Sequence, residues 1–340
     1  MPPPSGRGSA ARNEELLRRV AARTIQWQFQ AWGFGEAIAL RGLLRAARAL
    51  DDAEMFQFVR ALLLAYAGRE VGQSPAEHVA PGRELVNVYQ RTGDEPLLRA
   101  ARRLGAMHAS FPCGPHGARM HRPDLSGWRR QIWADCMDNE APFLVLLGTI
   151  TGEQPYIDQG LDEITAYARL LQDEETGLLF HGHEEACGRN GQLWARGNGW
   201  ALMGLIETLR LIPRGCPARA ELEWRLSRLC AGLIRCQDES GLWHTVVADP
   251  GTYLESTLAA MVASSMPAAF EAGMLDEKQY GAMTRMARQA VMNMIADDGS
   301  LQLVTEATPV GEHAMYATRR FGVYPWGQGS LLLMLSEACE

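Results

Sequence analysis

Apolar residues that recur three and four positions apart, in segment after segment, constrain the fold of this 340-residue chain more than any other feature. This period places apolar side chains on one face of an α-helix, whereas the alternating runs typical of strands are scarce. Twelve segments follow the pattern, which makes six helical hairpins. The predicted helices span residues 14–31, 35–49, 53–67, 81–91, 95–109, 137–151, 155–171, 199–211, 218–236, 253–273, 277–295 and 327–339.

The corners between the predicted helices repeat a short motif. Thr92-Gly93-Asp94 and Thr151-Gly152-Glu153 each place a glycine after one helix and an acid before the next. Glycine suits the left-handed position that ends a helix, and an acid at the next amino end can cap it. Residues 49–52 and 273–276 are looser versions of this corner. Such short turns make consecutive helices antiparallel neighbours.

Helical hairpins repeated along a whole chain form either a solenoid or a closed toroid. The sequence contains no tetratricopeptide, ankyrin or HEAT consensus. Segments 137–151, 199–211 and 327–339 are apolar or rich in glycine and alanine nearly all round, as helices of a buried inner ring would be. We therefore predict an all-α fold, an (α/α)6 barrel. We expect residues 13–340 to form this single domain after a disordered tail at residues 1–12.

The charge balance excludes some classes of partner. Thirty-three basic and 40 acidic residues give a net charge of -7, which argues against a general binder of nucleic acid or anionic membranes. The longest apolar runs are too short to cross a bilayer, and the amino terminus lacks an apolar signal segment. Seven cysteines without a C-x-x-C pair indicate reduced thiols and a cytoplasmic location. The sequence is compatible with a homo-oligomer.

The first candidate functional stretch contains Trp133 and Asp135 at the entry to an apolar helix. An acid beside a tryptophan at such a place can have its pKa raised by desolvation and serve as a proton donor. Alternatively, Asp135 or Asp138 simply caps the helix. On this stretch alone, the helix cap is the favoured interpretation.

The second candidate stretch runs from His181 and His183 to Arg196-Gly197-Asn198-Gly199-Trp200. Glycines on both sides of Asn198 predict a tight turn that brings Arg196 and Trp200 together. Arg196 can bind a carboxylate through its planar fork, and Trp200 offers a flat face to a sugar ring. The alternative is a structural helix entry with Trp200 in the core. His181-x-His183 also resembles a metal pair, but no further ligands follow at recognisable spacing, so no metal is expected.

Taken together, these stretches resemble glycoside hydrolase family 105, the unsaturated rhamnogalacturonyl hydrolases, and more distantly the unsaturated glucuronyl hydrolases. The resemblance extends from about residue 77 to 335. Its motifs are P-G-x-x-L…Y-x-x-T-G-D at 81–94, W-x-D at 133–135, A-P-F at 141–143, T-G-L…H-G at 176–182, W-x-R-G-N-G-W at 194–200 and G-x-Y-L-E-[ST] at 251–256.

The resemblance implies an α6/α6 barrel that hydrates the C4=C5 double bond left on a non-reducing uronic acid by polysaccharide lyases. The product is the released next sugar, and no metal or other cofactor is required. By the match, Asp135 is the acid/base carboxylate, and His181, Arg196 and Trp200 bind the unsaturated uronate. The partner is then a small unsaturated oligosaccharide. Trp133, beside the acid, is a further candidate for substrate contact.

Departures from the family pattern occur near the expected pocket. Glu77 stands where the family has an assisting aspartate, so we expect Glu77 to replace it. His183 stands where a tryptophan often follows H-G, and we expect it to contact the substrate. Asp138 and Glu140 occupy a region that is usually apolar and aromatic. These changes are expected to alter the choice of the sugar beyond the scissile linkage.

Two other functions fit the same barrel. A sugar 2-epimerase would use His181, His183 or His244 as an acid/base pair and release an intact sugar. A non-catalytic toroid would bind oligosaccharides without consuming them.

Overall fold

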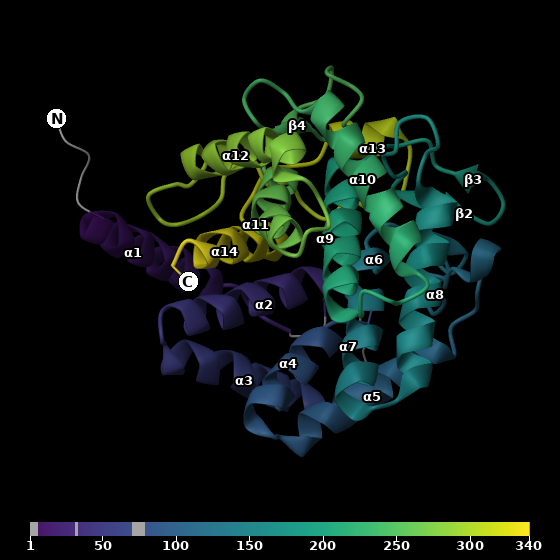
Figure 1. The fold of residues 1–340 in the computed structure, drawn as a ribbon, viewed down its shortest axis with the longest axis horizontal. Helices are drawn as coiled ribbons and strands as arrows, with labels where there is room; N and C mark the ends of the chain where they lie inside the picture. The colour runs from purple at the N-terminus through teal and green to yellow at the C-terminus, as the bar shows by residue number, and fades with distance from the viewer. Residues whose placement is uncertain (1–5, 31–32, 70–78, 340) are drawn as a thin grey trace.

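The structure, a computed structural model, describes residues 6–30, 33–69 and 79–339 and is built almost entirely from helices (Figure 1). Within these ranges, twelve helices of eleven or more residues alternate along the chain between an outer and an inner layer. The outer helices are α1 (Gly6–Ile25), α3 (Ala53–Ala67), α5 (Glu95–Ala109), α8 (Gln154–Leu171), α10 (Arg219–Cys236) and α12 (Glu277–Asn293). The inner helices are α2 (Phe34–Ala49), α4 (Gly82–Thr92), α7 (Ala141–Thr151), α9 (Ala195–Leu211), α11 (Thr257–Glu271) and α14 (Pro325–Glu337).

The inner helices form a closed ring. Each packs against the next inner helix along the chain, and α14 packs against α2. The first helix, α1, contacts both α14 and α2, so the two ends of the chain meet at the closure (Figure 1). In a solenoid each repeat contacts only its neighbours along the chain. The predicted (α/α)6 barrel is therefore confirmed.

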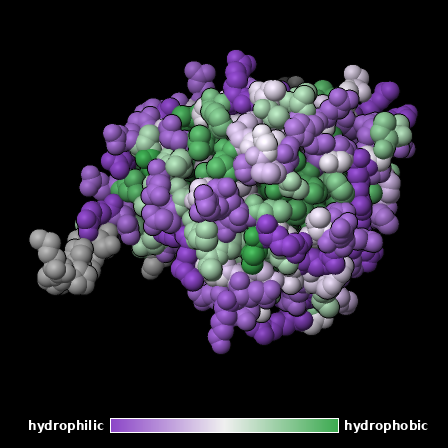
Figure 2. Space-filling view, turned by 90° about the horizontal axis from the view of Figure 1, so that it is seen from above, coloured by the Kyte–Doolittle hydropathy of each residue, from purple (hydrophilic) through white to green (hydrophobic). Residues whose placement is uncertain are grey.

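Burial separates the two layers as the sequence pattern predicts. Helix α7 buries eight consecutive residues, 141–148, and α9 buries 14 of its 17 residues. In contrast, α10 buries only six of its 18 residues, along one stripe. The inner helices approach closely at glycines: a Cβ atom on Gly329 of α14 would lie 2.5 Å from the backbone of Ile38 in α2. The face seen in Figure 2 mixes hydrophobic and hydrophilic side chains over most of its area, as exposed protein surfaces do.

The glycine corners form as predicted, but the capping differs. Gly93 and Gly152 end α4 and α7 with a positive φ of 72°. Asp94 precedes α5 without capping it and instead pairs with Arg60 at 2.6 Å. Asp52 in the looser corner does cap its helix, because its carboxylate accepts a hydrogen bond from the Met55 amide.

The inner helices share one direction. Arg48, Arg91 and Arg210, in the last turns of α2, α4 and α9, line one cavity. At the other end of the barrel, Arg196 in the first turn of α9 pairs with Glu255, just before α11. The barrel therefore has an amino-terminal end, which carries long loops, and a carboxyl-terminal end.

Short strands organise the amino-terminal loops. The strands β1 (Gln131–Trp133), β2 (Gly182–Glu184) and β3 (Gly188–Arg189) form one antiparallel sheet. A second sheet contains β4 (Trp243–His244) and β5 (Leu254–Glu255). Two short helices, α6 (Cys136–Asn139) and α13 (His313–Ala317), complete the loop regions.

Several predicted boundaries were wrong: the first helix ends at Ile25 rather than at residue 31, and the segment predicted at 137–151 divides into α6 and α7. Helix α1 begins at Gly6, so residues 6–12 are helical rather than a disordered tail, and residues 1–5 lie outside the described ranges. Helix α11 begins at Thr257 instead of residue 253, because residues 254–255 pair as β5. Helix α9 begins at Ala195, four residues before the predicted start. Within the described part of the chain, no helix has the length and apolar character needed to cross a bilayer.

Candidate active site

Asp135 lies between β1 and α6, and its side chain points at a histidine. The residue is 1% exposed, and its Oδ2 lies 3.2 Å from Nε2 of His181. Asp135 occupies the N-cap position of α6, but its carboxylate makes no capping hydrogen bond. The cap interpretation is therefore wrong for Asp135, which is a buried acid in contact with an imidazole.

Hydrogen bonds around His181 assign its tautomer. The hydroxyl of Tyr316 lies 2.6 Å from His181 Nδ1 and accepts hydrogen bonds from Asn190 Nδ2 at 2.9 Å and the Gly311 amide at 3.4 Å. Burial raises the pKa of Tyr316, so its hydroxyl keeps its proton at neutral pH and donates it to Nδ1. The ring proton of neutral His181 then sits on Nε2 and is donated to Asp135.

Strand pairing brings the W-x-D and H-G motifs together. Trp133 in β1 pairs with Gly182 in β2, and the amide of Ala134 donates to the carbonyl of His181 at 2.8 Å. Trp133 is 4% exposed, and its ring lies edge-on to that of His181 at 5.3 Å and stacks on His121 at 4.0 Å. The predicted neighbours Trp133, Asp135 and His181 therefore form one aromatic-walled cluster.

The two terminal nitrogens of Arg196 are bound to protein groups. One guanidinium nitrogen pairs with the buried carboxylate of Glu255, and the other donates to the Glu306 carbonyl at 2.9 Å and the Thr308 hydroxyl at 3.2 Å. The guanidinium also lies 4.4 Å from the centre of the Trp194 ring. The structure thus supplies Arg196 with a carboxylate from its own chain. Within the described ranges, only its buried Nε lacks a hydrogen-bond partner.

The R-G-N-G-W segment is helical rather than the predicted tight turn. It forms the first turns of α9, and a Cβ atom on Gly199 would lie 2.3 Å from the sulfur of Met261 in α11. Asn198 ties the helix to the preceding loop, because its side chain accepts from the Leu179 amide at 2.8 Å and donates to the Leu179 carbonyl at 3.0 Å. Trp200 is fully buried within the hydrophobic core, so the structure does not bring its face to the surface.

Two other predicted site residues are His183 and Glu77. His183 lies in β2 opposite Ile132 and is half-buried. Burial and the nearby charge of Arg189 lower the pKa of His183, so its imidazole is neutral at neutral pH. Its contact with substrate stays a prediction. Glu77 falls in residues 70–78, outside the described ranges, and its assisting role also stays a prediction.

Asp138 and Glu140, the acidic residues that depart from the family pattern, belong to two separate buried clusters. Asp138 faces the barrel interior and binds Arg41 through two hydrogen bonds of 2.8 and 3.2 Å, and Nη1 of Arg83 lies 3.6 Å from it. All three residues are buried. Asp138 therefore holds α6 to α2 and α4, and the expectation that it alters the sugar site is not supported.

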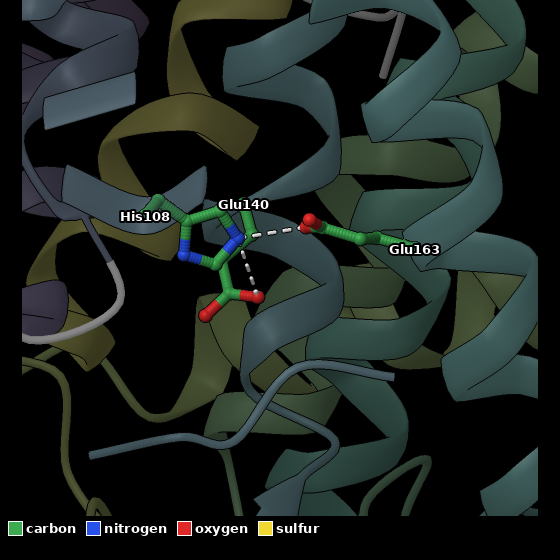
Figure 3. A group of neighbouring side chains, drawn as sticks. All are labelled: His108, Glu140 and Glu163. Atoms are coloured by element: carbon green, nitrogen blue, oxygen red, sulfur yellow. Dashed lines mark hydrogen bonds and ion pairs between the residues drawn. The ribbon is translucent and has the colours of Figure 1, made fainter. Parts of the chain in front are cut away.

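Glu140 belongs to a second buried cluster, with His108 of α5 and Glu163 of α8 (Figure 3). Nε2 of His108 lies 2.8 Å from Glu163 and 3.6 Å from Glu140. Burial alone would lower the pKa of His108, but the two carboxylates outweigh it and raise this pKa. Arg119 pairs with Glu163 at 2.6 Å, and the Tyr167 hydroxyl donates to Glu140. Two cations thus balance two carboxylates.

Sequence reasoning missed three residues of the site: Tyr316, Asn190 and Glu255. Tyr316 lies on the short helix α13 and Asn190 in a loop, both without a periodic pattern or motif, so no local signal identifies them. Glu255 stands within the G-x-Y-L-E-[ST] stretch, and its buried pairing with Arg196 could have been suspected from that motif.

Comparison with known proteins adds relatives over nearly the whole chain. Unsaturated rhamnogalacturonyl hydrolase YesR from Bacillus subtilis is 26% identical over 335 residues, which cover 96% of this chain and 94% of the relative. An unsaturated 3S-rhamnoglycuronyl hydrolase from Alteromonas sp. is 23% identical, with 95% and 86% covered.

Solved structures share the fold. The glycoside hydrolase from family 105 of C. acetobutylicum superposes with a TM-score of 0.85 at 21% identity, covering 95% of this chain and 98% of that one. The unsaturated glucuronyl hydrolase from Bacillus sp. GL1 gives a TM-score of 0.76 at 14% identity, with 96% and 95% covered.

Residues 12–340 match Glycosyl Hydrolase Family 88. The resemblance to unsaturated rhamnogalacturonyl hydrolases that the motifs indicated is confirmed, and the enzyme is a glycoside hydrolase. The match covers the whole barrel, including Asp135 and His181, and the chain belongs to Glycosyl Hydrolase Family 88.

Proposed function

We propose that this hydrolase removes the non-reducing-end 4,5-unsaturated uronic acid from lyase-generated oligosaccharides by hydrating its C4=C5 double bond. The observation that carries the proposal is the buried Asp135 carboxylate, 3.2 Å from His181 and without a capping role. The names of its relatives support the same substrate class, because both are hydrolases of unsaturated uronyl sugars.

The proposed chemistry needs one carboxyl group. The unsaturated ring is an enol ether, so a proton from Asp135 adds to C4 and leaves an oxocarbenium ion at C5. Water then adds to C5 and returns a proton to the Asp135 carboxylate. The resulting hemiketal opens by breaking the C5–O5 bond, which leaves a ketone at C5 and a hemiacetal at C1. That hemiacetal collapses to an aldehyde, which breaks the bond to the next sugar and releases it. One water molecule is consumed, and the enzyme regains its starting state.

His181 orients the acid in this scheme. Its Nε2–H group donates to Asp135, and its other nitrogen is fixed by Tyr316. A neutral imidazole held in this way stabilises the carboxylate formed after proton transfer without adding a full positive charge. Trp133 and Trp194 flank the imidazole and exclude water from it.

The uronate carboxylate also needs a partner. Because Arg196 already binds Glu255, its buried Nε is the donor with capacity for a substrate oxygen. Arg196 and Trp200 stay predicted substrate residues on the basis of the motif match. His183 and Glu77 stay predicted substrate and assisting residues because they replace family residues at those positions.

Substitution of Asp135 tests the proposal. On a lyase-generated disaccharide, the ultraviolet absorbance of the C4=C5 double bond should fall steadily with the wild-type enzyme. Asp135→Asn should slow this loss by about 100-fold or more, because the variant has no proton to give. Asp158→Asn, an exposed aspartate on α8, is the matched control and should retain wild-type turnover. Near-normal turnover by Asp135→Asn would remove the mechanism.

Location and assembly are separate expectations. All seven cysteines are free thiols, which supports the predicted cytoplasmic location. The homo-oligomer stays a prediction, and light scattering of the purified protein measures it directly.

A further inference from the structure

The side chain of Asn190 connects three parts of the loop layer at the amino-terminal end of the barrel. It is half-buried in the loop directly after β3, which meets α13 (Figure 1). Its Nδ2 donates to the Tyr316 hydroxyl at 2.9 Å and to the Gly311 carbonyl at 3.1 Å. Its Oδ1 accepts from the amides of Gly182 at 3.3 Å and Gln192 at 3.4 Å. Both polar atoms of the side chain therefore have partners.

These partners fix which way the Asn190 amide points. The oxygen and nitrogen of an asparagine side chain have nearly the same shape, so their places are assigned from the groups around them. A backbone carbonyl can only accept a hydrogen bond, and a backbone amide can only donate one. The Gly311 carbonyl therefore requires the nitrogen on its side, and the Gly182 amide requires the oxygen on the other. The amide must then present a donor to Tyr316.

The direction of this amide passes through two further side chains. The Tyr316 hydroxyl accepts from Asn190, so its single proton goes to Nδ1 of His181 at 2.6 Å. The ring proton of His181 then lies on Nε2, which faces Asp135 at 3.2 Å. Asn190, Tyr316, His181 and Asp135 thus form one hydrogen-bond chain whose donor direction starts at backbone groups.

The backbone holds both ends of this chain in place. The His181 amide donates to the Gln192 carbonyl at 2.8 Å, and the Asn190 amide donates to the Gly182 carbonyl at 2.9 Å. Because Gly182 follows His181 directly, Asn190 is fixed relative to the imidazole as well as to Tyr316. A Cβ atom on Gly182 would lie 2.5 Å from the side chain of Val310, so this close approach requires glycine.

We infer that Asn190 is a positioning residue, because the donor direction of its amide sets the ring tautomer of His181 and thereby aims a hydrogen bond at Asp135. The effect on turnover rests on the function proposed above, whereas the tautomer can be measured without substrate. A purely structural role would need the shape of Asn190 and its bonds to the two backbone amides. The inferred role also needs a donor where Nδ2 lies.

Asn190→Asp separates these two roles. It replaces the donor by an oxygen at nearly constant shape and keeps the acceptor for the Gly182 and Gln192 amides. The Tyr316 hydroxyl should then donate to the new carboxylate, so the ring proton of His181 moves to Nδ1. Nitrogen NMR of protein with labelled histidines reports this tautomer at mildly alkaline pH, where an ordinary imidazole is neutral. The His181 signals are those that disappear in His181→Gln.

Turnover of a lyase-generated disaccharide gives an independent measurement. Asn190→Asp should lower kcat about tenfold or more, because Asp135 then faces an acceptor in place of a donor. Asn190→Ala, which removes the donor without reversing it, should lower kcat less and give a mixture of His181 tautomers. A purely structural role predicts the opposite order, since alanine loses the acceptor that aspartate keeps. Asn190→Asp/Tyr316→Phe should be no slower than the slower single variant, because the effect passes through Tyr316.

Gln192→Glu is the matched control for charge. It adds the same charge two positions along the chain, and its side chain takes part in none of these hydrogen bonds, so His181 should keep the wild-type tautomer. The inference is overturned if His181 keeps that tautomer in Asn190→Asp and Asn190→Ala, or if Asn190→Ala is the slower of the two. A wild-type enzyme that leaves the unsaturated disaccharide intact would instead contradict the proposed function, and the NMR result would still test the role of Asn190.

Discussion

Tyr316 decides which nitrogen of His181 carries the ring proton. Its hydroxyl accepts from Asn190 and Gly311 and must therefore donate to His181 Nδ1, at 2.6 Å. The residue lies 135 positions from His181 in the sequence, on the short helix α13. The proposed catalytic carboxylate, Asp135, thus depends on a tyrosine that acts on it through His181.

Removal of this hydroxyl should impair turnover more than stability. In Tyr316→Phe, the ring proton of His181 can move to Nδ1. The unprotonated Nε2, which accepts rather than donates hydrogen bonds, then faces Asp135. We expect kcat to fall about tenfold or more, with unfolding free energy lowered by only about 1 kcal/mol. The pH profile of kcat should shift, which a merely structural role would not produce.

A second tyrosine provides the control for this experiment. Tyr280→Phe removes a hydroxyl that contacts Ser227, between α10 and α12, and should change neither kcat nor its pH profile. An unchanged pH profile in Tyr316→Phe would argue against the assigned tautomer.

The one-turn helix α6 links the two ends of the barrel. Asp135 precedes it and contacts His181, while Asp138, within it, pairs with the buried Arg41 and Arg83 in the barrel interior. The helix is held against α9 at Gly204, where an added Cβ atom would lie 2.1 Å from the carbonyl oxygen of Met137. The position of Asp135 is therefore set by backbone packing of α6 against α9.

Gly204→Ala tests this contact. An alanine normally stabilises a helix by up to about 1 kcal/mol over glycine, but here the backbone of α6 must move to admit it. We expect a net loss of about 1–3 kcal/mol in unfolding free energy, measured in urea, together with reduced kcat.

The matched change is Gly281→Ala in α12. Its Cβ would meet only the ends of the flexible Arg285 and Glu277 side chains, at 3.0 and 3.1 Å. That variant should be as stable as the wild type or slightly more so, with unchanged kcat. If Gly204→Ala and Gly281→Ala had the same unfolding free energy and the same kcat, the close contact at Gly204 would not fix the position of α6.

At the scale of the whole molecule, a buried ionic cluster joins three successive helical elements. His108 in α5 bridges Glu163 in α8 and Glu140 at the start of α7 (Figure 3). The other charged and titratable groups that face this cluster are Arg119, Tyr167 and Cys136. Because these elements are neighbours in the barrel wall, the cluster stabilises their packing rather than a single helix.

This cluster predicts a pH-dependent stability. The carboxylates raise the pKa of His108 above its unfolded value of about 6.5, so the folded state binds the proton more tightly than the unfolded chain. The stabilisation is complete below the unfolded pKa and is lost as the pH rises through the folded pKa. Unfolding free energy, measured in urea at several pH values, should therefore fall on the alkaline side of about 6.5.

His108→Gln should abolish most of this dependence. The variant should lose about 3 kcal/mol or more, because two buried carboxylates then face one cation fewer. His116→Asn, at an exposed histidine in the loop after α5, should keep the wild-type stability and slope. If the unfolding free energy of His108→Gln kept the wild-type dependence on pH, a group other than His108 would bind the proton.

The sequence by itself determined the helices and the ring they form. Helical period and glycine corners act over a few residues, so Gly93 and Gly152 could be identified without knowledge of the fold. Nearly all-round apolar segments such as 141–148 can be satisfied only by burial on every side, which an inner ring supplies. The family motifs also located Asp135 and His181 correctly as neighbours.

Only the tertiary structure decided what each site residue binds. From the sequence, Arg196 was expected to bind the carboxylate of the substrate. In the structure it pairs with Glu255, which is 59 residues away in the sequence. Trp200 was expected to stack against a sugar ring, but the packing of the inner helices buries its side chain. Asp138 was expected to alter the sugar pocket, but it binds Arg41, which is 97 residues away in the sequence. These pairings depend on which loops and helices come into contact when the barrel closes. Local sequence patterns do not specify such long-range contacts.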